Sequence, residues 1–389
     1  MGKGRYPYNG PKPGGAWPRV AGDTDLPGAN GEWGGKLDEL DVFGHSHDAR
    51  YLVNESRPNV QSVFGRMFGD GRDGDKVVTG YDSLGAIKSR QYDNVIIQSG
   101  GVFYNDGPYL FIGVKNTLQI DVGGLITLSG IDGTPGATAG VGGPGGQGRG
   151  GYGGAGGNQN VPGWGGQIFG SPFATAGANG GATLGGAAGS GKTLGSINFS
   201  GGGGGGGGGQ AGVAAHGGGG GGGGGANGGV GGDKGGTGVG NGSTPLGIGF
   251  TEQTLRGYLS LIKGHFGWGG GGGGGGSGGN DANASGGGGG AGGGALYIEA
   301  RKIVLGVSGV LIDVSGGNGG YGWGVNRGGT GGGGGGGSCI VIGGEITNIS
   351  TWRINATGGS GNAGLPPNGG NGGSGFKMII DLSNLPGRM

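Results

Sequence analysis

Two histidines separated by one serine stand in the stretch GHSHDARYL, residues 44–52. Side chains on an extended segment alternate with a period of two, so the imidazoles of His45 and His47 would point to the same side. One chain then offers two metal ligands, which is too few for a firm site. Three chains around a symmetry axis would offer six, a set that suits an octahedral first-row metal such as iron or nickel. The alternative is a solvated histidine pair near a turn.

The composition of the remaining chain is dominated by glycine, with 130 glycines in 389 residues. Collagen is excluded because only 15 prolines are present and the glycines form consecutive runs such as Gly201–Gly209 and Gly331–Gly337. Flexible coil is the second default for such tracts. Polyglycine can also adopt a threefold helix like polyproline II that keeps every N–H, so neighbouring helices can bond laterally. We favour packed glycine helices.

Charge and hydropathy exclude further classes of protein. The net charge is +1, from 24 basic and 23 acidic residues, so no electrostatic footprint for nucleic acid is expected. No apolar run approaches the ~18–20 residues of a bilayer-spanning helix. The first residues, MGKGRYPYNG, lack an apolar signal core, so synthesis in a cytoplasm without a signal peptide is expected. The single cysteine, Cys339, excludes an intrachain disulfide and reads as a buried strand thiol.

Four zones follow one another along the chain. Residues 1–41 read as an irregular attachment arm, and residues 42–60 carry the histidine pair. Residues 61–130 hold short β-branched and aromatic runs separated by turn sequences, which predicts a β-helix-like strand scaffold. Residues 131–389 alternate glycine tracts with short apolar strands and form a glycine-rich tip.

A repeated unit organises the glycine-rich zone. Strand-like stretches lead into a small residue and then glycine in GLITLSG, GVLIDVSGG and STWRINATGG, and each later returns through a strand in ALYIEARKIVLG, SCIVIGGEITNIS or GFKMIIDLSN. The strands would form a narrow scaffold, and three glycine arms would pack beside each other. The sequence leaves open whether the glycine helices bond within one chain or across three.

Enzymatic chemistry finds little support. A polysaccharide depolymerase would need two facing carboxylates. The candidates are Asp121, Glu299, Asp313 and Glu345, which lie in or beside strand-like runs without a dense acidic groove. Gly191-Lys192-Thr193 ends like a phosphate-binding loop, but it stands inside a glycine arm without a convincing preceding strand. We therefore expect no enzyme.

Aromatic residues gather in the interruptions of the arms. They can cap the glycine layers, or present a receptor-binding surface, because tyrosine and tryptophan offer a large contact area for little entropy. The residues that we favour for receptor contact are Trp164, Phe169, Phe173, Phe266, Trp268, Tyr321 and Trp323.

Two motifs resemble tailed-bacteriophage tail proteins. LDELDVFGHSHDARYL is similar to the "LDELxxxGHxHDxRYxxK" segment of tail fibres, and departs from it where Leu52-Val53-Asn54 replace the lysine-containing end. FGDGRDGDKVVTG, running on through NVIIQSGG to LFIGVKNTLQID, resembles glycine-rich phage tail proteins. The glycine arms are similar in composition to receptor-binding adhesins at the tips of long tail fibres.

The resemblance implies a fold and a set of partners. The implied fold class is all-β with polyglycine II helices: an intertwined trimeric fibre in which a short β-helix or β-prism scaffold carries glycine-rich arms packed as a polyglycine sandwich. His45 and His47 would hold a metal ion, expected to be iron, shared by the three chains of a homotrimer. The N-terminus would contact other phage tail proteins, and the tip would contact a bacterial surface polysaccharide or outer-membrane protein.

The resulting function hypothesis is non-catalytic adhesion of a virion tail protein to the host surface. A structural tail or baseplate component without receptor contact is the runner-up, and a tail-spike polysaccharide depolymerase is third.

The histidine hypothesis predicts a metal-to-chain ratio. Elemental analysis of the purified protein should find about one iron per three chains, because a symmetric site would share one ion among three histidine pairs. The double variant His45→Ala/His47→Ala should lose the metal and lower the thermal stability of the trimer while the glycine arms stay folded. A trimer that carries no metal would contradict the hypothesis.

Overall fold

The computed structural model divides the chain into two compact units, residues 1–67 and 68–389, and each is described by itself. Residues 61–62, 65–66, 109, 192–194, 197–200, 351 and 384 are described by their backbone alone. The other described residues are 68–85, 89–107, 110–137, 141–148, 150–158, 163–166, 220–224, 270–276, 278, 284–323, 328–348, 350, 352–361 and 368–383.

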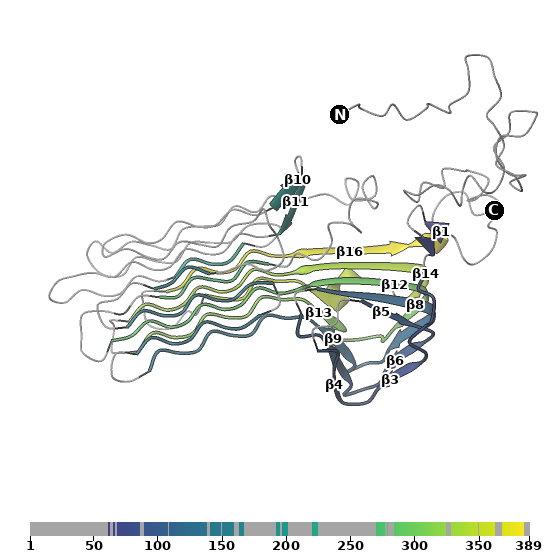
Figure 1. The fold of residues 1–389 in the computed structure, drawn as a ribbon, viewed down its shortest axis with the longest axis horizontal. Coiled ribbons are helices and arrows are strands. Elements are labelled where there is room, and N and C mark those ends of the chain that lie inside the picture. Colours follow the sequence, from purple (N-terminus) through teal and green to yellow (C-terminus); the bar gives the residue numbers. More distant parts are fainter. Residues whose placement is uncertain are drawn as a thin grey trace, which may run out of the picture. The chain divides into compact units, whose positions relative to one another are not determined.

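The larger sheet of the second unit has seven strands, and all of its pairings are parallel (Figure 1). Its order is β16-β14-β12-β8-β6-β3, and β5 pairs with the first part of β8. The strands are β3 (Lys76–Val78), β5 (Ser89–Tyr92), β6 (Val95–Ile97), β8 (Tyr109–Ile120), β12 (Ala295–Leu305), β14 (Ser338–Thr347) and β16 (Phe376–Asp381).

A second, five-stranded sheet is also parallel throughout, in the order β15-β13-β9-β7-β4. Its strands are β4 (Tyr81–Ser83), β7 (Val102–Tyr104), β9 (Leu125–Thr127), β13 (Ile312–Asp313) and β15 (Ile354–Asn355). The chain alternates between the sheets: β3, β6, β8, β12 and β14 in the larger sheet are each followed by a turn and a strand of the smaller one.

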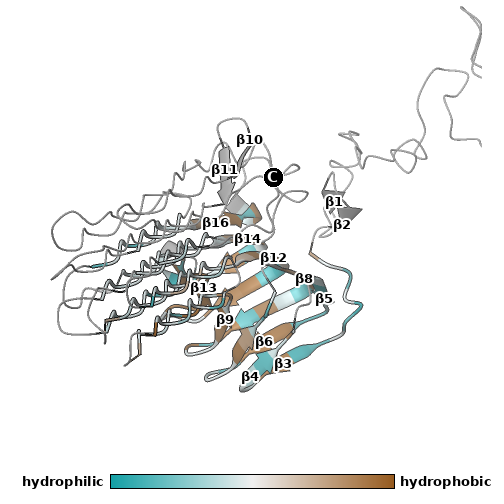
Figure 2. Ribbon diagram, turned by 60° about the vertical axis from the view of Figure 1, so that its left-hand side comes forward, coloured by the Kyte–Doolittle hydropathy of each residue, from teal (hydrophilic) through white to brown (hydrophobic). Residues whose placement is uncertain are grey.

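One hydrophobic core joins the two sheets. Leu118 and Ile303 from the larger sheet belong to the same buried cluster as Phe103, Ile126 and Ile312 from the smaller sheet. Hydropathic colouring shows the apolar residues gathered in the strands (Figure 2). Cys339 is buried in β14, which confirms the expected buried strand thiol, and this burial raises the pKa of the thiol.

The predicted fold class is wrong. We expected an intertwined trimeric fibre on a β-helix or β-prism scaffold, whereas the described residues form two parallel sheets within a single chain. Each long excursion brings the same chain back beside its own earlier strand, so that β8, β12, β14 and β16 pair with one another. The core between the sheets is therefore filled by one chain and needs no strand from another.

The remaining described elements are small. Two antiparallel pairs, β1 (Gln61–Ser62) with β2 (Gly65–Arg66) and β10 (Lys192–Leu194) with β11 (Ile197–Ser200), lie outside the parallel sheets. The short 3-10 helices η1 (Thr351–Arg353) and η2 (Leu382–Asn384) are the helices of the described residues. Neither has the length and hydropathy of a membrane-spanning helix.

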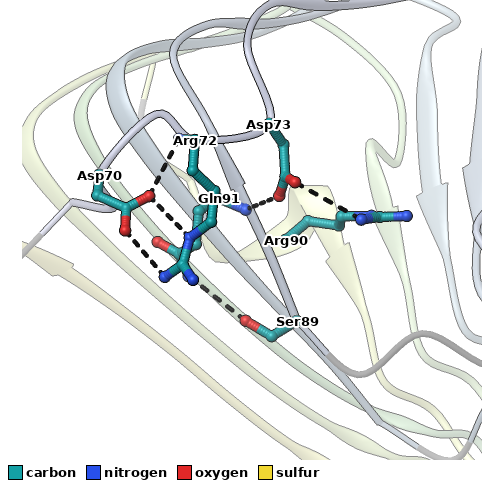
Figure 3. Close-up of polar contacts among 6 residues, drawn as sticks. All are labelled: Asp70, Arg72, Asp73, Ser89, Arg90 and Gln91. Carbon is teal, nitrogen blue, oxygen red and sulfur yellow. Dashed lines mark hydrogen bonds and ion pairs between the residues drawn. The ribbon is translucent and has the colours of Figure 1, made fainter.

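The motif FGDGRDGD fastens the start of the second unit to β5 (Figure 3). The Asp70 carboxylate accepts hydrogen bonds from the backbone N–H and from Nε of Arg72. The hydrogen bond from the backbone N–H is the main cause that lowers the pKa of Asp70. Asp73 accepts a 2.7 Å bond from the Gln91 amide and lies 3.6 Å from Arg90. Gly69 has a φ of 70°, and a Cβ there would meet the backbone of Gly113. The motif is therefore built to hold the backbone in place.

The glycine segments continue the strands as a bundle of extended chains (Figure 1). In the segment 286–294, which precedes β12, successive amides donate to three different neighbours in rotation, and every third amide returns to the same neighbour. This rotation requires about three residues per turn, the geometry of a polyproline II helix. Glycine keeps the N–H that proline lacks, so each turn bonds sideways in three directions.

The same segment has six neighbours in all, because its carbonyls accept bonds from three further segments. The six neighbours are residues 128–134, 143–150, 151–157, 270–276, 317–320 and 329–335. Adjacent members of this ring also bond to one another, as in the 2.9 Å bond from the Thr134 amide to the Pro144 carbonyl. Residues 328–337 repeat the arrangement with their own ring of neighbours. The interior of the bundle is thus a hexagonal array of backbones in one chain.

Few side chains fit inside this array, and Ala291 and Thr330 are the non-glycine residues of these two segments. A Cβ built on Gly289 would collide with the carbonyl of Gly273, and one on Gly290 would collide with that of Gly317. The consecutive glycines of the sequence are therefore a packing requirement of the interior.

The packing predicts a large stability loss for one added methyl group. Gly289→Ala should lower the free energy of unfolding by about 2–3 kcal/mol or more, because the array must separate to admit the Cβ. Gly80→Ala is the matched control, since its Cβ would meet nothing within 4 Å. That change should stay within about 1 kcal/mol of the parent. Chemical denaturation measures both, and equal unfolding midpoints for the two variants would contradict the array.

Candidate functional site

Segments at the surface of the bundle differ from those inside it because they carry exposed side chains at every third position. In residues 315–321, Asn318 and Tyr321 are exposed, while Gly317, Gly319 and Gly320 are buried. On a threefold helix, positions three apart lie on the same side. One side of the segment therefore faces solvent and carries side chains, and the other two sides face backbones and carry glycine.

The same X-Gly-Gly pattern recurs in other surface segments. Its non-glycine members in the described residues include Val141, Pro144, Gln147, Tyr152, Asn158, Thr357, Ser360, Asn371 and Ser374, all of which are exposed. This period of three was present in the sequence and is the signal that composition alone does not reveal. It separates residues that must be glycine from residues that are free to serve a function.

Three neighbouring segments place their exposed residues in a hydrogen-bonded rung. Asp132, Asn318 and Ser360 come from the segments that follow β9, β13 and β15. The Asn318 amide donates to Asp132 Oδ1 at 2.6 Å, and the Asn318 Oδ1 accepts from both the amide and the Oγ of Ser360 at 2.8 Å. The rung is therefore fixed by side chains as well as by backbone.

Further rungs lie on either side of this one. The amides of Gly130, Gly133 and Gly136 donate to the carbonyls of Ser315, Asn318 and Tyr321, so the register is constant along the segments. We call the resulting surface the ladder face. It consists of Ser129, Ser315 and Thr357 in one rung, Asp132, Asn318 and Ser360 in the next, and Pro135 with Tyr321 in the third.

The ends of β9, β13 and β15 fix where each of the three segments of the ladder face begins. Thr127, Asp313 and Asn355 occupy one register position in β9, β13 and β15. In each case the side chain accepts a hydrogen bond from the amide two residues later, at 3.0–3.2 Å. This local turn ends the strand and aligns the three segments as they leave the sheet.

Two of the predicted receptor-binding aromatics stand near the end of the ladder face: Tyr321 in the third rung, and Trp323 two residues further along the same segment. Tyr321 and Trp323 have exposed fractions of 51% and 47%. The Trp323 amide donates to the Ser285 carbonyl at 2.8 Å, and the Ser285 Oγ donates to the Ala137 carbonyl at 2.9 Å. Both rings are thus carried by a backbone that is bonded to its neighbours.

Trp164 is exposed as well, at 55%, but it lies on another side of the bundle. Its amide donates to Ala155 and its carbonyl accepts from Gly275. The segments of these two residues, 151–157 and 270–276, both bond to residues 286–294, which bond in turn to the segment of Tyr321. Whole layers of the bundle therefore separate Trp164 from Tyr321.

Several predicted residues fall outside the described part of the chain. They are His45, His47, Phe169, Phe173, Phe266 and Trp268. Within the described residues, no group of three or more His, Cys, Asp or Glu side chains is placed to hold a metal ion.

The carboxylates considered for hydrolysis are spread over different elements. Asp121, in the turn after β8, accepts a 2.7 Å bond from Gln119, and Asp313 on β13 accepts from the Ser315 amide. Glu345 on β14 lies 3.7 Å from Lys302 on β12. These three side chains serve local contacts.

Glu299 on β12 is only 2% exposed and is hydrogen-bonded to Tyr297. Burial, with a smaller contribution from the Glu299 charge, raises the pKa of the Tyr297 hydroxyl. The Tyr297 ring stacks on Phe111 with ring centroids 4.8 Å apart. The Glu299 carboxylate thus belongs to a buried structural cluster on the larger sheet.

No protein-family model matches this chain, and no curated protein or solved structure matches it significantly. The chemistry of the exposed surface must therefore indicate the function.

Proposed function

We propose that this chain is a tailed-phage receptor-binding protein of the virion tail, which adheres to the bacterial surface without catalysis. The observation that carries the proposal is the exposed pair Tyr321 and Trp323, held on a rigid glycine bundle beyond the sheets. The resemblance of residues 37–52 and 68–80 to phage tail proteins supports the same conclusion.

The bundle suits adhesion for a physical reason. Binding costs free energy whenever side chains or loops must be ordered at an interface. Here the backbone beneath the two rings is already fixed by bonds to neighbouring segments. Large aromatic rings on a preorganised support are the type of residue that dominates binding energy.

Assembly would strengthen such adhesion. In this proposal the N-terminal residues 1–41 contact other tail proteins, and His45 and His47 bind a metal ion, expected to be iron, shared in a homotrimer. Several tips on one particle would then bind with avidity, because each contact raises the effective concentration of the next.

Cell binding tests the proposal. Fluorescently labelled full-length protein should bind saturably to at least one strain in a panel of bacterial hosts, without release of reducing sugar. The double variant Tyr321→Ala/Trp323→Ala should weaken binding at least about tenfold, because it removes both exposed rings. Tyr152→Ala, which removes another exposed ring from a glycine segment, should bind like the parent.

The alternatives give different results in the same assay. Folded protein that binds no strain would contradict adhesion and favour a structural tail component. Release of reducing sugar from bound cells would instead favour a depolymerase. An equal loss of binding in Tyr152→Ala would show that Tyr321 and Trp323 are not the contact.

A further inference from the structure

We propose that the ladder face binds an extended, uncharged polysaccharide. This inference rests on the proposed adhesion and names the class of receptor. It follows from four properties of the ladder face: fixed polar groups, an aromatic ring, a regular spacing and a low charge.

The polar groups of the middle rung match the hydroxyl groups of a sugar. Asp132 offers carboxylate oxygens, Asn318 offers an amide, and Ser360 offers a hydroxyl, so the rung can both accept and donate. The 2.6 and 2.8 Å bonds among these residues hold the side chains in place before any ligand arrives. Little rotamer entropy would then be lost on binding.

The aromatic ring stands one repeat further along the same face. Tyr321 is half exposed, and its carbonyl accepts the Gly136 amide at 2.8 Å, which fixes the backbone beside Pro135. An aromatic ring with an apolar face and a polar hydroxyl can stack on the C–H face of a sugar while staying hydrated at its edge.

The spacing of the rungs suits a repeating polymer. Successive X positions on a threefold helix are about 9 Å apart, from a rise of about 3.1 Å per residue. This distance is close to the length of two sugar units in an extended glycan. A ligand along the segments would therefore present similar groups to successive rungs, whereas a compact ligand would reach only one.

The charge of the ladder face selects among polymers. Asp132 is the one charged residue among its eight members. A phosphate- or uronate-rich chain would meet that carboxylate without a cation on the face to balance it, which is unfavourable. The face also presents a single ring among polar groups, whereas protein interfaces centre on an apolar core. A neutral polysaccharide fits both observations.

Binding to purified polysaccharide tests this inference. The probe is delipidated surface polysaccharide from a strain that the protein binds, with a periodate-oxidised sample of the same material as its control. Wild-type protein should bind the intact probe and lose binding to the oxidised one. Asn318→Ala and Tyr321→Ala should each raise the Kd about tenfold or more.

Matched variants on another side of the bundle control for general damage. Tyr152 is an exposed tyrosine, and Asn158 is an exposed asparagine whose Oδ1 accepts the Gly142 amide at 2.8 Å, much as Asn318 bonds its own neighbour. Tyr152→Ala and Asn158→Ala should leave the Kd within about twofold of the parent. Thermal unfolding of all four variants verifies that each is folded.

The outcomes separate this inference from the adhesion on which it rests. If cells bind the protein but the polysaccharide neither binds nor competes, the ladder-face inference is overturned while adhesion survives. Equal polysaccharide binding by parent, Asn318→Ala and Tyr321→Ala would overturn it as well. If the protein binds no cells, the proposed adhesion itself fails.

Discussion

The lateral bond between the amide of one glycine segment and the carbonyl of the next is the interaction on which the rest of the structure depends. A long loop normally carries unsatisfied backbone groups to the surface, because it has no partner for them. Here residues 286–294 satisfy amides and carbonyls through six neighbouring segments. Such close bonding requires glycine at these positions, since even a methyl group on Gly289 would collide with the backbone of Gly273. Glycine is the residue with the greatest freedom to lose on folding, and this dense bonding offsets that entropy.

Function follows from where the array ends. Inside it almost every position is glycine and no surface is exposed, so recognition is left to the outward side of surface segments and to the far end of the bundle. The period of three then places exposed residues of neighbouring segments in register, as in Asp132, Asn318 and Ser360. A surface of this kind is rigid because its support is backbone, and it can change its chemistry by substitution at X positions without disturbing the packing. Binding to a surface receptor is a use that such a scaffold serves well.

The sequence predicts the individual strands well, but it does not predict which glycine segments pack beside one another. Alternating apolar residues predicted strands that the structure contains, including β9, β12, β13, β14, β15 and β16. The fold class was predicted wrongly, because the lateral partners of a glycine segment leave no mark in its own sequence. The sequence left open whether the bonds run within or between chains, and in the structure they run within one. For the same reason Trp164 and Tyr321 were grouped by composition, although layers of the bundle separate them. The X-Gly-Gly period was readable in advance, and it would have identified Asn318 and Ser360 as exposed.

Amide hydrogen exchange over residues 286–294 and 331–337 tests the central claim most directly. Deuterium uptake by the full-length protein, localised by fragmentation mass spectrometry, reports whether each glycine amide is bonded. The hexagonal array predicts that these amides exchange about as slowly as those of β12, because every one has a carbonyl partner. Exchange at the rate of an unstructured glycine peptide would contradict the array, and with it the rigid support for the ladder face.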